Sequence, residues 1–215
     1  MFKILDFIKQ IFRGRSIYRI LFNWQVREHC GNLSGSVLDL AGGSNPSYYA
    51  YLPQDLNIIK TDYKKQEGVD KIIDINKPLP FNDGLVEYVF LFNAFYIVKD
   101  CEMFLGELRR IIKKGGQIFI ATPFIANEMP EPDDFRRLSK EGLGQEFRRA
   151  GFTDFTIVRF GERFSAAAYL LHPFFIFNIV RLLAYSLCLC LDKMIPKKIK
   201  KIHPTPLGYF CVIKL

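Results

Sequence analysis

Two kinds of pattern are missing from this chain, and each absence excludes a class of protein. The five cysteines have neither metal-site nor disulfide spacing, since Cys188 and Cys190 are one residue closer than the usual two-residue gap. The chain therefore fits a reducing, cytoplasmic setting. A continuous apolar stretch is also missing from the start, where Lys3, Asp6 and Lys9 recur, so we expect no cleavable signal peptide.

The patterns of nicotinamide-dependent oxidoreductases are missing as well. The sequence has no Gly-x-Gly-x-x-Gly segment and no Tyr-x-x-x-Lys set that would handle a hydride. An oxidoreductase stays an alternative that thermal stabilisation by NAD would reveal.

Acidic side chains are absent from residues 193–215, whose six basic side chains give a net charge of +6. Residues 1–29 have a net charge of +4, so residues 30–192 sum to −2 within the total of +8. Basic residues at both ends, rather than around a central cleft, favour an anionic membrane surface over nucleic acid as a partner.

The most informative segment that is present runs from Ser36 to Pro46. An apolar strand pattern ends in Gly42 and Gly43, whose lack of Cβ atoms lets the backbone turn sharply and approach a ligand closely. Asp39 places a carboxylate in the same crevice. Asp62 ends the next apolar run about twenty residues later. In a βαβ unit, a carboxylate at this spacing accepts hydrogen bonds from the hydroxyls of a ribose. The alternatives are a plain structural turn and a solvated loop aspartate.

Taken in order, these segments resemble class I S-adenosylmethionine-dependent methyltransferases. Residues 37–43 look like the first motif of that family, and Asp62 with Tyr63 looks like the second. Asp74 and Ile75, with residues 79–83, look like the segment around the adenine. Residues 107–120 look like the helix, turn and fifth strand. The resemblance covers residues 35–160 and implies no metal. It implies that S-adenosyl-L-methionine is bound by Asp39, Ala41, Gly42, Gly43, Asp62, Tyr63, Asp74, Ile75 and Asn93.

Three positions depart from the family pattern. Ala41 stands where the family's first glycine is usual, and Asn45 stands at the last, where we expect its tolerance of left-handed dihedrals to preserve the turn. Val86-Glu87 replaces a common Phe-Asp pair. Ile97 falls where many relatives have a histidine. These departures leave open a non-catalytic protein that retains the fold.

The alternation of patterns predicts an α/β fold, a Rossmann-like doubly wound sheet of seven strands covered on both faces. We expect strands near 36–40, 57–61, 71–73, 88–92, 117–121, 153–159 and 208–215. The resemblance implies that the last strand is antiparallel and lies between the fifth and sixth. We expect helices near 2–13, 16–28, 46–51, 101–113 and 139–150, the last with Ser139 as its N-cap and Gly151 as its stop.

The chain divides into four expected parts. Basic amphipathic helices occupy 1–30, a methyltransferase core occupies 31–160, a hydrophobic helical insertion occupies 161–207, and the final strand of the core occupies 208–215. The N-terminal helices either cap the sheet or lie on a membrane interface.

The insertion has an unusual composition, because residues 166–191 contain a single fully charged side chain, Arg181. We favour a helical hairpin that dips into one leaflet of a membrane. A buried dimer interface or lid is an alternative. A true span is disfavoured by Pro173, by Arg181 near the centre, and by the need to return the last strand to its sheet.

The loop 122–138 is the candidate acceptor contact. Pro132, Asp134, Arg137, Ser139 and Gly142-Leu143 resemble a pattern of methyltransferases from bacterial surface-glycan gene clusters, with Asp133 in place of a histidine. Asp134 is the candidate catalytic base, and the alternative is that it pairs with Arg137 to fix the loop. The expected protein is a cytoplasmic, membrane-associated methyltransferase for an amphiphilic or glycan-type acceptor, such as a lipid-linked glycan. Whether it forms a homodimer stays open.

Overall fold

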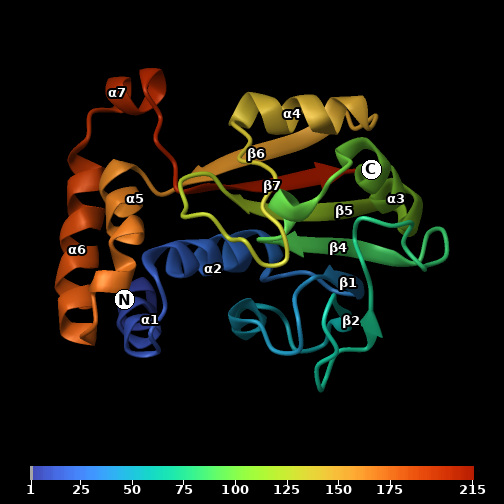
Figure 1. Cartoon of the computed structure of the whole chain (residues 1–215), viewed down its shortest axis with the longest axis horizontal. Coiled ribbons are helices and arrows are strands. Elements are labelled where there is room, and N and C mark those ends of the chain that lie inside the picture. Colours follow the sequence, from blue (N-terminus) through green and yellow to red (C-terminus); the bar gives the residue numbers. More distant parts are fainter. Residues whose placement is uncertain (1) are drawn as a thin grey trace.

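Seven strands form one mixed sheet in the computed structural model, which describes residues 2–215 and the side chains of residues 3–215 (Figure 1). The strand order is β3-β2-β1-β4-β5-β7-β6, and β7 pairs antiparallel with both neighbours. The predicted Rossmann-like sheet is therefore confirmed. Its strands are β1 (Ser36–Leu40), β2 (Asn57–Asp62), β3 (Lys71–Ile72), β4 (Val86–Phe92), β5 (Ile112–Pro123), β6 (Asp154–Phe160) and β7 (Gly208–Lys214).

Two predicted boundaries differ from the structure. The helix expected over 101–113 ends at Ile111, and β5 begins at once, so residues 113–116 belong to the strand. The pairing with β4 is irregular over these residues, since the register shifts between the pairs Val86–Ile112 and Tyr88–Gln117. Glycine fits at position 116 because a Cβ atom there would lie 2.6 Å from the backbone oxygen of Glu87. The segment expected as a helix over 46–51 is the 3₁₀ helix η1 (Ser47–Tyr51).

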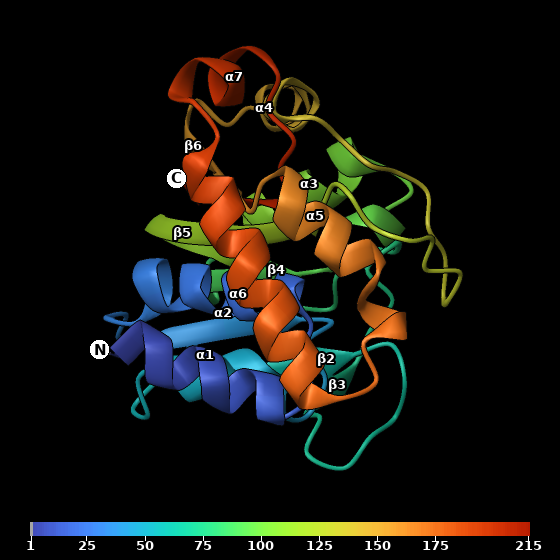
Figure 2. The same ribbon diagram turned by 90° about the vertical axis from the view of Figure 1, so that its left-hand side faces the viewer.

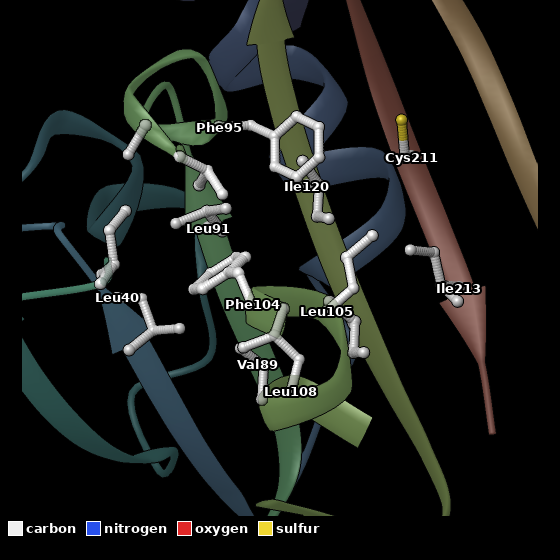
Figure 3. Close-up of a cluster of buried hydrophobic side chains, with 14 of the residues drawn as sticks. Leu40, Val89, Leu91, Phe95, Phe104, Leu105, Leu108, Ile120, Cys211 and Ile213 are labelled. Atoms are coloured by element: carbon white, nitrogen blue, oxygen red, sulfur yellow. The ribbon is translucent and has the colours of Figure 1, made fainter. Parts of the chain in front are cut away.

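One face of the sheet is covered by α3 (Cys101–Ile111) and α4 (Lys140–Arg149). Phe104, Leu105 and Leu108 of α3 pack on side chains of the central strands such as Val89 and Ile120 (Figure 3). Asp100 caps α3 through the amide of Met103. As predicted, Ser139 caps α4 through the amide of Gly142. This cluster of fully buried apolar side chains holds the central strands in position, and the candidate site described below lies at the carboxyl edge of this sheet.

The other face is covered by α2 (Ile17–Cys30), and a further group of helices stands off the carboxyl ends of the parallel strands (Figure 1). The helix α2 lies directly on the sheet, with Ile17, Ile20, Phe22 and Val26 fully buried. The helices α1 (Phe2–Phe12), α5 (Arg163–Leu170) and α6 (Asn178–Met194) form the further group (Figure 2). The structure shows that α2 caps the sheet and that α1 leaves one face exposed, so the membrane alternative for α1 stays a prediction.

The helix α1 is held by its inner side alone. Phe7 and Ile11 are buried against α2 and its surroundings. The Asp6 carboxylate accepts hydrogen bonds from Trp24 Nε1 at 2.8 Å and from the Tyr51 hydroxyl at 2.6 Å. The predicted apolar stripe of Leu5, Ile8 and Phe12, with Ile4, lies on the outer side and is exposed.

The insertion between β6 and β7 folds as α5, the short η3 (His172–Phe174), α6 and α7 (Lys197–Ile202). Asp192 at the end of α6 accepts from the amides of Phe164 and Ser165, so α5 and α6 form an antiparallel hairpin. The Arg181 guanidinium donates to the backbone oxygen of Phe175 at 2.6 Å, which turns its charge back into the protein. Among the helices within residues 2–215, none has the length and apolarity to cross a bilayer.

Candidate active site

A pocket of about 200 Å³ opens where β1, β2 and β3 end. The carboxyl ends of parallel strands are where ligands bind in open α/β sheets. Five of the nine predicted donor-binding residues line it, namely Ala41, Asp62, Tyr63, Asp74 and Ile75. The remaining lining residues are Ile73, Asn76, Ile97, Lys99, Pro132 and Asp133. The structure therefore brings together the turn after β1, the end of β2 and the segment after β3.

The Asp62 carboxylate lies over the glycine turn. It is the last residue of β2, and its Oδ1 accepts from the amide of Lys64 at 2.9 Å. A Cβ atom at Gly43 would lie 3.3 Å from Asp62 Oδ2, so the turn approaches the carboxylate closely. Gly43 has a φ of 72°, which L residues rarely adopt. Asp62 thus keeps lone pairs for the two hydroxyls of a ribose.

The left-handed position in the turn is not the one expected from the sequence. Asn45 was expected to adopt left-handed dihedrals, but the positive φ angles lie at Ala41 (59°) and Gly43. A non-glycine residue in this region costs about 1–2 kcal/mol, because its Cβ crowds the following carbonyl oxygen. Ala41 therefore adopts in strained form the conformation that glycine would adopt freely.

Asp39 supports the turn from below rather than lining the pocket. Its side chain is fully buried, and Oδ2 accepts from the hydroxyls of Tyr48 and Tyr49, each at 2.7 Å. Burial raises the pKa of this carboxyl to about 7, although both hydroxyls and the charge of Lys60 oppose the rise. A Cβ atom at Gly42 would lie 2.3 Å from Asp39 Oδ2. Glycine is therefore required here for close packing.

Asn93 stands directly after β4 with a φ of 58°. Its Oδ1 accepts from the hydroxyl of Tyr18 at 2.5 Å. Its Nδ2 is buried and has no hydrogen-bond partner among the described residues, and the same holds for Asp39 Oδ1. Buried polar atoms without partners call for an explanation. A zwitterionic amino-acid end, such as that of S-adenosylmethionine, offers an ammonium for Asp39 and a carboxylate for Asn93, so these residues fit that donor.

The loop after β5 crosses the carboxyl edge (yellow in Figure 1) and holds Asp134 in an ion pair. The Asp134 carboxylate accepts from Arg137 Nη2 at 2.6 Å and from the amide of Met129 at 2.9 Å. Burial alone would raise the pKa of this carboxyl, but these hydrogen bonds and the Arg137 charge lower it. A carboxylate so engaged is a weak base. The geometry favours the loop-fixing alternative, and the catalytic role of Asp134 stays a prediction.

Two exposed ion pairs join this loop to the rest of the pocket rim. Lys64 lies 3.8 Å from Glu131, and Lys99 lies 3.9 Å from Asp133. Exposed pairs contribute little to stability, about 0–1 kcal/mol each. Ile97 forms part of the pocket wall, so an apolar side chain stands where many methyltransferases have an imidazole. In residues 2–215 no group of three or more His, Cys, Asp or Glu could hold a metal ion.

Sequence reasoning missed several residues of this edge. Lys99 and Asn76 line the pocket, and Tyr18 reaches Asn93 from α2. Lys99 and Asn76 follow β4 and β3, so topology alone could have signalled them. Tyr18 could not be found in this way, because its position depends on how α2 packs on the sheet.

The central part of the chain is similar to known methyltransferases. Residues 35–120 match the family model described as a methyltransferase domain. The sarcosine/dimethylglycine N-methyltransferase of Halorhodospira halochloris is 28% identical over 105 residues. That alignment covers 43% of this chain and 38% of the relative, so the chain matches well under half of the relative's length.

Solved structures show the same fold at low identity. A SAM-dependent methyltransferase of Archaeoglobus fulgidus has a TM-score of 0.62 and 16% identity, covering 96% of this chain and 97% of its own. Phosphoethanolamine N-methyltransferase 2 of Haemonchus contortus, in complex with phosphomonomethylethanolamine and S-adenosylhomocysteine, has a TM-score of 0.58 and 14% identity, covering 90% and 52%. The [4+2]-cyclase SpnF has a TM-score of 0.56 and 15% identity, covering 90% and 79%. Residues 35–120 therefore match a methyltransferase domain, and the chain as a whole shares its fold with solved S-adenosylmethionine-dependent methyltransferases.

Proposed function

We propose that this enzyme transfers a methyl group from S-adenosylmethionine to an amphiphilic acceptor at an anionic membrane surface. When bound, S-adenosylmethionine supplies the methyl group of a sulfonium, and transfer to an acceptor oxygen or nitrogen leaves the neutral thioether S-adenosylhomocysteine. The proton of the acceptor atom passes to solvent or to a carboxylate of the loop after β5. Positioning of acceptor and donor can supply about 7–11 kcal/mol.

The donor is held by the residues around the pocket. In this proposal Asp62 and Tyr63 bind the ribose side, while Asp74 and Ile75 flank the adenine. Gly42 and Gly43 let the backbone approach the methionine part. Support comes from the shared pocket and from the buried polar atoms of Asp39 and Asn93 that lack partners within residues 2–215.

One observation carries the membrane part of the proposal, an exposed apolar surface on the helices that stand off the carboxyl ends of the strands. Seventeen of the 21 large apolar side chains found exposed in the described residues lie on α1 or in segment 164–202, although these make up about a quarter of the chain. α1 and α6 lie side by side there (Figure 2). The side chains of this exposed apolar surface are those of Ile4, Leu5, Ile8, Phe12, Phe164, Leu170, Leu171, Phe174, Ile176, Phe177, Ile179, Val180, Leu183, Leu187, Met194, Ile199 and Ile202.

Charge and shape at this surface favour lipid. A groove of about 590 Å³ between α1, α2 and α6 is lined by apolar side chains such as Ile4 and Leu189. Three lysines, Lys3, Lys193 and Lys200, also line it, and they outnumber its two acidic residues, Glu162 and Asp192. Apolar residues bordered by lysines match an interface of acyl chains and anionic headgroups. Residues 1–30 and 161–207 then attach the enzyme, while residues 31–160 and the final strand bind the donor.

Vesicle flotation tests the membrane part. We expect the protein to float with vesicles containing phosphatidylglycerol at low salt, and less with pure phosphatidylcholine. The double substitution Phe174→Ser/Phe177→Ser should reduce flotation at least about tenfold, since burial of each phenylalanine side chain in lipid contributes about 1.5–3 kcal/mol to the free energy of binding. Ile72→Ser, at an exposed apolar residue on β3, is the matched control and should change nothing.

Two results would contradict the membrane part. One is wild-type protein that remains soluble at low salt. The other is a stable dimer in sedimentation that involves the same surface and leaves flotation absent. In the second case a second copy of this chain covers the apolar face. A lipid-linked glycan is the amphiphile that the pattern around Pro132 and Asp134 favours, and methylation assays with membrane extracts would identify it.

A further inference from the structure

A cluster of phenol and guanidinium groups lies at the carboxyl end of β4, beside the donor pocket. We call it the tyrosine–arginine cluster, and its members are Tyr18 and Arg19 of α2, Tyr96 of η2 (Phe95–Ile97), Arg137 of the loop after β5, and Tyr169 of α5. The rings of Tyr18 and Tyr169 are 5.4 Å apart. The guanidinium carbon of Arg137 lies 5.2 Å from the centre of the Tyr96 ring. Arg19, Tyr169, Tyr96 and Arg137 all act electrostatically on Tyr18, so four separate segments converge on one place.

The cluster contains hydrogen-bond donors that lack partners. Arg137 Nε is buried without a partner in the described part of the chain. The Arg19 guanidinium packs over the Phe22 ring at 5.6 Å and forms no hydrogen bond or ion pair within residues 2–215. The hydroxyls of Tyr96 and Tyr169 likewise bond to no other described residue. Phenols and guanidinium groups presented together call for an acceptor-rich ligand.

The electrostatics point to an anion. Burial raises the pKa of Tyr96 and of Tyr169, so both keep their protons at neutral pH, while the charges of Arg19 and Arg137 oppose the rise. Asp134 is the acidic group that acts on Tyr96, and Arg137 already neutralises it. Arg19 forms no ion pair within residues 2–215, so its guanidinium is available to an anionic ligand.

We propose that the tyrosine–arginine cluster binds a phosphate-type oxyanion on the methyl acceptor. This inference rests on the proposed function, whose acceptor it describes more closely. A phosphate has several strongly accepting oxygens and can be approached from more than one side, as the two guanidinium groups and the phenols require. Asn93, which joins the cluster through Tyr18, ties it to the donor site.

The position of the cluster also explains why the acceptor is amphiphilic. Tyr169 is followed directly by the exposed Leu170 and Leu171, which belong to the apolar surface. An acceptor whose anionic head lies in the cluster can therefore extend its apolar part over α5 and η3. The same chemistry could come from a lipid headgroup or from a soluble phosphate ester.

Calorimetry with a soluble probe tests the cluster directly. Glycerol 3-phosphate is titrated into protein saturated with S-adenosylhomocysteine, and phosphatidic acid in phosphatidylcholine vesicles forms the lipid arm. Arg19→Gln should weaken glycerol 3-phosphate binding at least about tenfold, the loss expected for a charge-assisted hydrogen bond. Tyr169→Phe, which removes only a hydroxyl, should weaken it by about threefold. Arg15→Gln removes an exposed arginine of the same segment and should change neither ligand.

The outcomes separate the two proposals. Unchanged binding of S-adenosylhomocysteine in Arg19→Gln, with loss of the phosphate probe, supports the cluster. The cluster proposal is overturned if the wild type does not bind glycerol 3-phosphate at about 10 mM, because a dissociation constant above that concentration is weaker than that of a specific site. An equal loss in Arg15→Gln also overturns it. Absent flotation with intact probe binding refutes the membrane attachment alone, and absent S-adenosylhomocysteine binding refutes the donor site.

Discussion

The donor pocket and the tyrosine–arginine cluster share one edge of the sheet, yet they are assembled in opposite ways. The donor pocket is built from short segments that each follow a strand, and its carboxylates are already tied to neighbouring amides, as Asp62 is to Lys64. The cluster is built from side chains of four distant segments, and one of its donors, Arg137 Nε, is buried with no partner within the described chain. The first region is shaped by local backbone geometry, and the second depends on the packing of distant helices and loops.

The largest expected effect comes from breaking the local geometry of the donor side. Gly42→Ala would place a Cβ 2.3 Å from Asp39 Oδ2 and 2.4 Å from the Tyr48 hydroxyl, both buried. We expect a loss of about 3 kcal/mol in stability and loss of S-adenosylhomocysteine binding. Thermal melts and calorimetry measure both. Gly106→Ala is the control, because no atom lies within 4 Å of its Cβ position and α3 should gain stability. Unchanged donor binding in Gly42→Ala would mean that the turn is not the donor cradle.

This difference also decides how much of the molecule could be predicted. The strands could be located from patterns in the sequence, and the place of β7 follows from the family resemblance. Five of the residues predicted to bind the donor do line one pocket at the ends of β1, β2 and β3. The cluster could not be predicted, because Tyr18 and Tyr169 reach the edge only through the packing of α2 and α5. Arg137 was seen in the sequence as a partner of Asp134, but its second contact, with Tyr96, depends on the tertiary fold.

The next effect is a dependence of stability on pH that originates under the donor turn. The folded-state pKa of Asp39 is raised from 3.8 to about 7 by burial. Protonated Asp39 therefore stabilises the fold fully below pH 3.8, and this contribution is lost as the pH rises through about 7. We expect unfolding free energy to fall by about 2–3 kcal/mol between about pH 5 and pH 8 from this group.

Asp39→Asn should flatten that pH dependence, since an amide does not titrate in this range. Denaturant unfolding at several pH values measures the slope for both proteins. Asp55→Asn, at an exposed loop residue, serves as the control and should retain the wild-type slope. A wild-type slope that survives in Asp39→Asn would show that another group causes it.

A more selective change removes one donor contact and leaves the fold intact. Asp62→Ala should weaken S-adenosylmethionine binding by about 30-fold, or about 2 kcal/mol, through loss of hydrogen bonds to ribose hydroxyls. Binding of glycerol 3-phosphate to the tyrosine–arginine cluster should persist, because Asp62 belongs to the donor side alone. Calorimetry with both ligands provides the measurement, and Asp55→Ala is the control. If Asp62→Ala weakened both ligands equally, the two regions would not be separate sites.

The smallest expected effect concerns strain in the donor turn. Ala41 has a φ of 59°, which costs an L residue about 1–2 kcal/mol and a glycine almost nothing. Because glycine also gains entropy in the unfolded chain, Ala41→Gly should stabilise the protein by at most about 1 kcal/mol, or about 2–4 °C in Tm. Ala167→Gly, at an exposed position of α5, should instead destabilise it by about 0.5–1 kcal/mol.

Stabilisation of Ala41→Gly with unchanged donor affinity would show that the strain at Ala41 is incidental to binding. Stabilisation with weaker donor affinity would show that the left-handed Ala41 methyl, which lines the pocket, contacts the donor. Destabilisation would show that packing of the Ala41 methyl outweighs its backbone strain, and the donor turn would then owe its shape to side-chain contacts, as the tyrosine–arginine cluster does.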